Sequence, residues 1–501
     1  MVFSSNVFLL CFMPVFFLVY FLLPKKTRNY TLLLASLVFY AWGAPDFLLQ
    51  LLLSIVANFY LVKAMCRTDQ PRRKKLLCAL SLLISLGLLA YYKYANFLVD
   101  NLNALISWFQ KDSSPFSVLT RSASLRAAPF RFPFPQVLLP IGISFFTFQS
   151  ITYTLDTYRG VNQPLRRLSD YMLYIIMFPQ LIAGPIVRYC DVAEQIQQRE
   201  SSMGDRLQGF YRFVIGLSKK ILIADIMGAY VNATLKNPIA ELDSGTAWLA
   251  ALAYSFQIYF DFAGYSDMAI GLGRIMGFRF PENFDNPYTS RSVTEFWKRW
   301  HITLGSFIKN YLYIPLGGNR KGPRRTYLNL WLCFLLSGLW HGASWNFVVW
   351  GALHGLFICL DKVFKVRGER LEVRGEKKKK RHLSTLISQL STFIIVVILW
   401  VFFRIEQLPD AFAFVGRMFA FDFTHLDVAD NLRFFVTLLV AFFFSFITLT
   451  KFGKRLQERV YFTEPTDRQH IVYWIIAAFA FYFCIAAFNS ASFSPFIYFR
   501  F

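Results

Sequence analysis

The feature that most limits how this chain can fold is a long uncharged run, Tyr327 to Leu360, with a histidine near its middle. The run holds no Lys, Arg, Asp or Glu. Hydrocarbon offers no water to an imidazole, so an ionisable side chain at membrane depth is costly and usually faces a cavity or the bundle interior. Such residues normally mark a functional site. We therefore predict that His341 is the catalytic centre.

The composition predicts a multi-span membrane protein. Of the 501 residues, 55% are hydrophobic and 57 are Phe, which is more apolar surface than a soluble domain of this length carries. The formal charge of +23 does not indicate a nucleic-acid partner, because the basic residues lie in short clusters between apolar stretches, where they set topology and contact lipid head groups. The seven cysteines are scattered without metal-ligand spacing, so no metal site is predicted.

The apolar stretches predict an all-α polytopic fold with about 10–12 transmembrane helices and further re-entrant or interfacial helices, because each crossing needs roughly 20 apolar residues. We expect a single membrane domain that covers residues 1–501. Its parts are N-terminal spans in residues 1–110, a core in residues 137–362, a basic cytoplasmic linker in residues 363–382 and C-terminal spans in residues 383–501. A loop rich in Pro and Phe, roughly residues 113–135, separates the first two parts.

Charge bias predicts the path of the uncharged run. Basic clusters flank it on both sides, so both of its ends should be cytoplasmic. A single helix would be roughly 50 Å long and would place its ends on opposite sides. We therefore predict a broken pair of half-length helices, with the break at Ser337-Gly338 or at Gly342-Ala343-Ser344, and with Ser344 capping the second helix. The alternative is one long tilted helix with a basic loop outside.

A second histidine, His301, lies in a segment that mixes Trp and Tyr with Lys and Arg (residues 294–322). This composition suits the membrane interface or a re-entrant element. His301 either reaches towards His341 from a different element or simply faces lipid head groups. Its neighbours Lys298 and Arg299 either form a solvated face or attract an anionic donor such as the phosphates of coenzyme A.

Two carboxylates, Asp261 and Asp267, also lie in an apolar stretch. They either orient a histidine or bind acceptor hydroxyls, or they neutralise Arg and Lys side chains in structural pairs. For His354 we expect a structural role, because it shares no helical face with His341 if the run is broken.

Five segments in order along the chain resemble the membrane-bound O-acyltransferase family, and within it the bacterial alginate O-acetyltransferase branch. They are MFPQLIAGPIVRY (177–189), FDFAGYSDMAIGLG (260–273), FWKRWHITLGSFIKNYLYIPLGGNR (296–320), SGLWHGASWNFVVWGALHG (337–355) and SPFIYFRF (494–501). The resemblance implies a membrane enzyme that moves an acyl group from a thioester donor to a hydroxyl. It also implies that His341 is catalytic and that His301 is the second active-site residue.

The chemistry of acyl transfer agrees with these roles. A base must take the hydroxyl proton, and a neutral imidazole suits that task, so His341 is the predicted general base. A donor must steady the tetrahedral oxyanion, and His301, Trp340 or backbone N–H groups at the break are candidates. Ser344 is a further possible supporting residue. No tightly bound cofactor is expected, since acetyl-CoA or another acyl-thioester is the donor substrate.

The sequence therefore predicts an O-acyltransferase, of the O-acetyltransferase type, in the inner membrane of a bacterial cell. It would carry an acetyl group from a cytoplasmic thioester to an extracytoplasmic glycan, or to an esterase-like partner protein that completes the transfer. Two other classes would use the same residues differently. One is a proton-coupled transporter or flippase with His and Asp as a proton relay, and the other is a non-catalytic subunit of a polysaccharide export complex. The identity of the glycan is left open.

Overall fold

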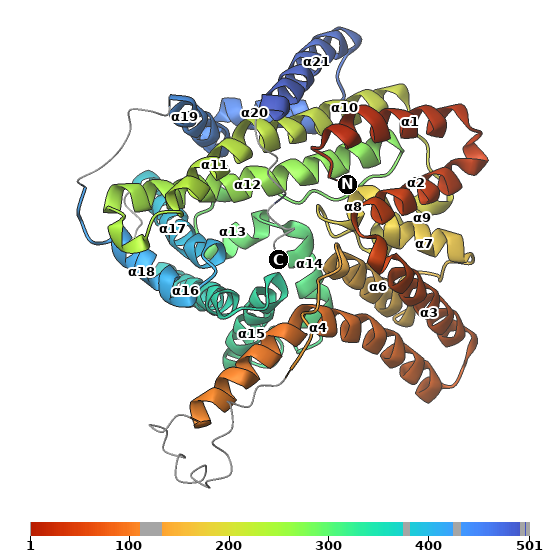
Figure 1. The fold of residues 1–501 in the computed structure, drawn as a ribbon, viewed down its shortest axis with the longest axis horizontal. Coiled ribbons are helices and arrows are strands. Elements are labelled where there is room, and N and C mark those ends of the chain that lie inside the picture. Colours follow the sequence, from red (N-terminus) through yellow and green to blue (C-terminus); the bar gives the residue numbers. More distant parts are fainter. Residues whose placement is uncertain (1, 111–132, 374–380, 424–431, 491–495, 497–501) are drawn as a thin grey trace.

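The computed structural model describes residues 2–110, 133–373, 381–423, 432–490 and 496 (Figure 1). Within these ranges the chain forms helices and the loops between them, and the only β-pairing is an isolated bridge between Phe284 and Trp300. Six helices of the described part are long and apolar enough to cross a bilayer. The predicted all-α, polytopic class is confirmed, whereas the number of about 10–12 crossings stays a prediction because shorter helices contribute to the bundle.

The N-terminal part is a set of four helices at one side of the bundle (Figure 1). They are α1 (Met13–Leu22), α2 (Arg28–Gly43), α3 (Leu48–Arg67) and α4 (Pro71–Gln110). Polar side chains join α3 to α4: the Ser81 hydroxyl donates to Asn58 Oδ1 over 2.5 Å. Inside a bilayer the hydrophobic effect does not drive helices together, because lipid tails are as apolar as the side chains. Hydrogen bonds between helices and close packing hold them together instead.

The central part surrounds α12 (Ser244–Ile275), a 32-residue helix that is buried along nearly its whole length. Glycines let α10 approach it closely, since a Cβ on Gly209 would lie 2.6 Å from the Gly271 carbonyl oxygen. Small residues at a helix crossing are typical of membrane proteins. The remaining helices of this part are α6 (Ile143–Tyr158), α7 (Leu168–Ile176), α8 (Phe178–Leu181), α9 (Tyr189–Gln197), α10 (Met203–Ser218), α11 (Asp225–Thr234), α13 (Val293–Arg299) and α14 (Ile302–Ile308).

The uncharged run folds as a helical hairpin of α15 (Pro323–His341) and α16 (Trp345–Val373). Its arms pack side by side, because a Cβ on Gly338 would lie 3.0 Å from the Gly351 Cα, and Trp331 Nε1 donates to the Ala352 carbonyl over 3.1 Å. The break lies at residues 342–344, which is one of the two predicted positions. The alternative prediction of one long tilted helix is wrong.

The prediction of half-length arms is also wrong. The arms have 19 and 29 residues, or about 28 and 43 Å at 1.5 Å per residue. Each arm extends beyond the uncharged run into the flanking basic sequence, since α15 begins at Pro323 and α16 ends at Val373. Long basic side chains are tolerated on helix ends because they reach out to the interface.

The C-terminal part packs against α10, α12 and α16 (Figure 1). It consists of α17 (Arg381–Arg404), α18 (Leu408–Met418), α19 (Leu432–Phe446), α20 (Lys451–Tyr461) and α21 (Asp467–Ser490). Because α16 continues to residue 373 and α17 begins at residue 381, helices occupy much of the predicted linker at 363–382. Residues 374–380, most of the loop predicted at 113–135 and most of the terminal segment 494–501 lie outside the described residues.

Candidate active site

His341 is the last residue of α15 and lies at the turn of the hairpin. The helix ends here because Gly342 takes an extended conformation, and α16 restarts where the Val348 N–H donates to the Ser344 carbonyl. Capping by the Ser344 side chain stays a prediction. The imidazole is 3% exposed and is surrounded by aromatic rings, with centroids 4.7 Å away for Trp340, 5.1 Å for Trp350 and 5.2 Å for Phe403.

His301 comes to the same place from another part of the chain. It links α13 to α14 and is 1% exposed, so it does not face lipid head groups. Its φ of 45° is unusual for a residue other than glycine, and such strain is concentrated at functional sites. Its ring centroid lies 6.1 Å from that of Trp340. One indole therefore lies beside both predicted catalytic histidines, which come from different elements of the fold.

Asn283 orients the His301 ring. Its amide nitrogen donates to Ser266 Oγ over 3.0 Å and to the Gly184 carbonyl over 3.3 Å, and its amide oxygen accepts from the Thr303 hydroxyl over 2.9 Å. These partners fix which end of the amide is the oxygen. That oxygen lies 3.0 Å from His301 Nδ1, and because it can only accept, Nδ1 must carry the proton. Neutral His301 therefore presents the lone pair of Nε2.

Trp340 supplies a donor between the two histidines. Within the described part of the chain, its buried Nε1 has no hydrogen-bond partner, and the same is true of Trp350 Nε1 on the other side of His341. Buried indole N–H groups normally find an acceptor. A bound molecule that brings an oxygen to this position would satisfy them.

Lys93 and Tyr94 of α4 hold the end of α15. The Lys93 ammonium donates to the Trp340 carbonyl, and the Tyr94 hydroxyl donates to the Leu339 carbonyl over 2.8 Å. Carbonyls in the last turn of a helix have no partner inside the helix, and a cation there also interacts favourably with the helix dipole. Lys93 was not among the predicted site residues. It is the only charged residue between Lys75 and Asp100, and the same kind of isolation singled out His341.

Lys93→Met is expected to lower kcat for acyl transfer roughly tenfold and to leave KM for the donor nearly unchanged. A hydrogen bond from a charged donor contributes about 1.5–3 kcal/mol, and its loss frees the turn that carries His341. Tyr94→Phe is the matched control, since it removes the neighbouring neutral bond alone and should have a smaller effect. Wild-type kcat in Lys93→Met would show that Lys93 does not position the histidine.

A small cavity lies against His341. Its volume is about 80 Å³, and it is lined by residues 139–145, Ile182, Trp340 and His341. A site of this size holds several water molecules or a small acyl group. Gly142 shapes its wall: φ is 77°, and a Cβ there would come within 2.6 Å of the Leu181 carbonyl oxygen. The catalytic imidazole is thus buried but has space beside it for a reacting group.

The two predicted carboxylates form ion pairs. Asp267 accepts from Arg212 over 2.7 Å and from Lys219 over 2.6 Å, and Asp261 lies 2.9 Å from Lys220. This is the structural alternative that the sequence left open for them. Ion pairs of this kind offset part of the desolvation free energy of charges buried inside a membrane protein.

The other predicted residues lie at the edge of the site or support it. Lys298 is exposed, and Arg299 binds Glu295 over 2.6 Å, so a role in donor binding stays a prediction for both. His354 is fully buried and accepts a hydrogen bond from Trp297 Nε1 over 3.1 Å, which agrees with the structural role expected for it.

Comparison with known proteins shows which family of membrane proteins this chain belongs to. The sequence profile of the membrane-bound O-acyltransferase family matches residues 162–403, which include both histidines. The chain is 39% identical to the probable alginate O-acetylase AlgI of Pseudomonas putida over the full length of both proteins. It is 35% identical to the peptidoglycan O-acetyltransferase of Helicobacter pylori over 82% of this chain and 78% of the relative.

The fold and site are thus those of a multi-span α-helical enzyme with two histidines in its interior. The chain belongs to the membrane-bound O-acyltransferase family, in the branch of the alginate O-acetylases. It is an O-acyltransferase.

Proposed function

We propose that this enzyme transfers an acetyl group from a cytoplasmic thioester, such as acetyl-CoA, to hydroxyls of an extracytoplasmic glycan, or to a partner protein that completes the transfer. The names of the relatives support a glycan acceptor, since they specify alginate and peptidoglycan. A more distant relative, the teichoic acid D-alanyltransferase of Bacillus subtilis, is 27% identical over 45% of this chain. The Pseudomonas relatives also support a place in the inner membrane of a bacterial cell.

The observation that carries the proposal is the position of His341. It lies at a turn inside the hairpin of α15 and α16, beside a cavity and one indole away from His301. A donor on one side of the membrane and an acceptor on the other can both reach a histidine at this depth. Both ends of the hairpin are basic, which supports a cytoplasmic position for them.

The proposed reaction uses His341 as the base. The acceptor oxygen attacks the thioester carbonyl and forms a C–O bond while its proton passes to His341. The tetrahedral oxyanion accepts a hydrogen bond from Trp340 Nε1, one of the buried indole donors that have no partner in the described part of the chain. When the C–S bond breaks, the leaving thiolate takes the proton back from His341. The imidazole is neutral again at the end, so no cofactor is consumed.

His301 acts on the acceptor in this scheme. With its proton held on Nδ1 by Asn283, the neutral ring accepts a hydrogen bond at Nε2 but cannot donate one to an oxyanion. It therefore orients the acceptor hydroxyl, and Trp340 takes the oxyanion role for which the sequence offered several candidates. Bringing the two reactants into line in this way contributes a large part of the rate of a two-substrate reaction.

The decisive experiment separates an enzyme from a carrier. Purified protein in detergent, with acetyl-CoA and a soluble oligosaccharide acceptor, should release free thiol and acetylated product without any ion gradient. The His341→Ala protein serves as the matched control and should do neither. Transport of substrate into liposomes without an acyl donor, together with no thiol release, would overturn the proposal in favour of a transporter.

A further inference from the structure

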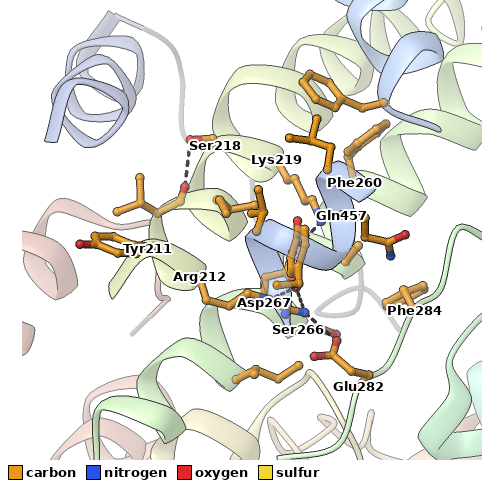
Figure 2. Close-up of a pocket in the computed structure, with 18 of the residues that line it drawn as sticks. Tyr211, Arg212, Ser218, Lys219, Phe260, Ser266, Asp267, Glu282, Phe284 and Gln457 are labelled. Atoms are coloured by element: carbon orange, nitrogen blue, oxygen red, sulfur yellow. Dashed lines mark hydrogen bonds and ion pairs between the residues drawn. The ribbon is translucent and has the colours of Figure 1, made fainter. Parts of the chain in front are cut away.

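A large cavity is enclosed by α10, α12 and the C-terminal helices α19, α20 and α21, and His341 is not among the residues that line it (Figure 2). Its volume is about 1100 Å³, which exceeds the range of roughly 300–1,000 Å³ usual for small-molecule sites. The reaction proposed above does not use it. We propose that this cavity binds an anionic phospholipid, with the phosphate at its charged end and the acyl chains along its apolar walls.

The charged end is a network of buried ion pairs. Arg212 binds Asp267 and Glu282 over 2.7 and 2.6 Å, and Lys219 binds Asp267 over 2.6 Å. Figure 2 shows these four side chains gathered together. The Tyr461 ring of α20 covers both cations, at 4.2 Å from the Arg212 guanidinium carbon and 5.5 Å from Lys219 Nζ. Both cations keep N–H groups beyond those used in the pairs, because a guanidinium has five and an ammonium three.

The charge of this end favours an anion. Five basic residues line the cavity, against the carboxylates of Asp267 and Glu282. The basic residues are Arg212, Lys219, Arg274, Arg279 and Arg459. Asp205 binds Arg274 and Arg279 from outside the cavity, and Glu464 also acts on Arg274. Among the described residues that line the cavity, basic side chains therefore outnumber acidic ones, which favours an anionic ligand.

The walls favour a lipid over a soluble phosphate ester. They are built from Val214 and Ile215 of α10, Val440 and Phe444 of α19, and Ile476 and Ala480 of α21. The segment Leu432–Leu449, which contains α19, and the segment Asp467–Phe488 of α21 are long and apolar enough to cross the membrane. These walls therefore stand at the depth of the hydrocarbon. Interiors are close-packed, and in a bilayer the molecules available to fill an apolar space of this size are acyl chains.

One residue, Asn283, belongs both to the wall of the cavity and to the active site. Asn283 lines the cavity and lies 3.0 Å from His301 Nδ1. Its neighbour in sequence, Glu282, binds Arg212 at the charged end. A phosphate held by this network would therefore fix the loop that orients a catalytic histidine.

The test measures lipid binding and does not depend on acyl transfer. Delipidated full-length protein in detergent is titrated with phosphatidylglycerol, and its thermal unfolding is followed. A ligand that binds only the folded state raises the midpoint, so we expect a rise of a few degrees with phosphatidylglycerol and a smaller one with phosphatidylcholine. Native mass spectrometry of the protein before delipidation should show one phospholipid retained per chain.

Two arginines of α20 provide matched variants. Arg459 lines the cavity and Arg455 does not, although both are exposed on the same helix. Arg459→Gln should weaken phosphatidylglycerol binding about fivefold, because a basic side chain near an anionic lipid contributes about 1 kcal/mol. Arg455→Gln should bind like the wild type. Ala480→Trp, which fills the tail region, should lose the retained lipid.

Three results would overturn the proposal. Equal weakening in Arg455→Gln and Arg459→Gln would indicate general attraction of the surface to anionic micelles. Stabilisation by glycerol phosphate or coenzyme A as strong as that by phosphatidylglycerol would assign the site to a soluble phosphate. Lipid retained by Ala480→Trp at the wild-type level would place the bound molecule elsewhere.

Discussion

His341→Ala is expected to abolish acyl transfer while the protein still inserts into the membrane and folds. General acid–base catalysis contributes about 10²–10⁴ in rate. Among the described residues that line the small cavity, only His341 has a side chain that can act as a base. The measurement is kcat/KM for transfer from acetyl-CoA with purified protein. Expression level and thermal unfolding of the same preparation show whether the fold has survived.

A second substitution separates the loss of a base from the loss of packing. The His341 ring is enclosed by Trp340, Trp350 and Phe403, so alanine leaves a hole there. His341→Gln fills more of the space without supplying a comparable base and should be as inactive as His341→Ala. The matched control is His354→Gln, which changes another buried histidine and should keep most of the activity. Wild-type rates in either variant of His341 would refute its role.

The break in the uncharged run could be predicted to within two positions, one of which is correct, because a helix end depends on local sequence. Gly342 ends one helix and the next begins directly after Ser344, and the flanking basic residues favour a chain that returns to the same side. The lengths of the arms could not be predicted in the same way. The positive-inside rule reports where basic residues end up, but not whether they lie on a loop or on the last turns of a continuing helix.

The side chains that contact the catalytic residues depend on tertiary structure. The hydrophobic periodicity of the sequence does not predict such contacts. Asn283 lies in a loop 18 residues before His301 and contacts it only because α13 and α14 turn back. The pairing of Asp267 with Lys219, 48 residues earlier, likewise requires the close crossing of α10 and α12. Lys93 is a different case, because its isolation in an apolar stretch was visible in the sequence and could have predicted a buried cation, although no such prediction was made.

Asn283 and His301 should behave as one unit in kinetics. His301→Ala is expected to lower kcat/KM about 10²–10³-fold, the size of effect seen when a positioned polar group is removed from an active site. Asn283→Ala should cost about tenfold, because the ring of His301 is then free to turn and to present the wrong nitrogen. Some acyl transfer should remain in His301→Ala, because His341 and Trp340 are still in place.

The double variant decides whether Asn283 works through the histidine. If its only catalytic contribution is to hold the proton on Nδ1, its removal in the His301→Ala background should cost almost nothing further, and the double variant should match His301→Ala. Asn283 also bonds Ser266, Gly184 and Thr303, so a purely structural role would multiply the two losses instead. Coupling between residues in contact is commonly 0.5–3 kcal/mol, and distant, independent sites add to within about 0.3–0.5 kcal/mol. Measured kcat/KM values for the four proteins therefore distinguish an oriented imidazole from a loop that is merely well packed.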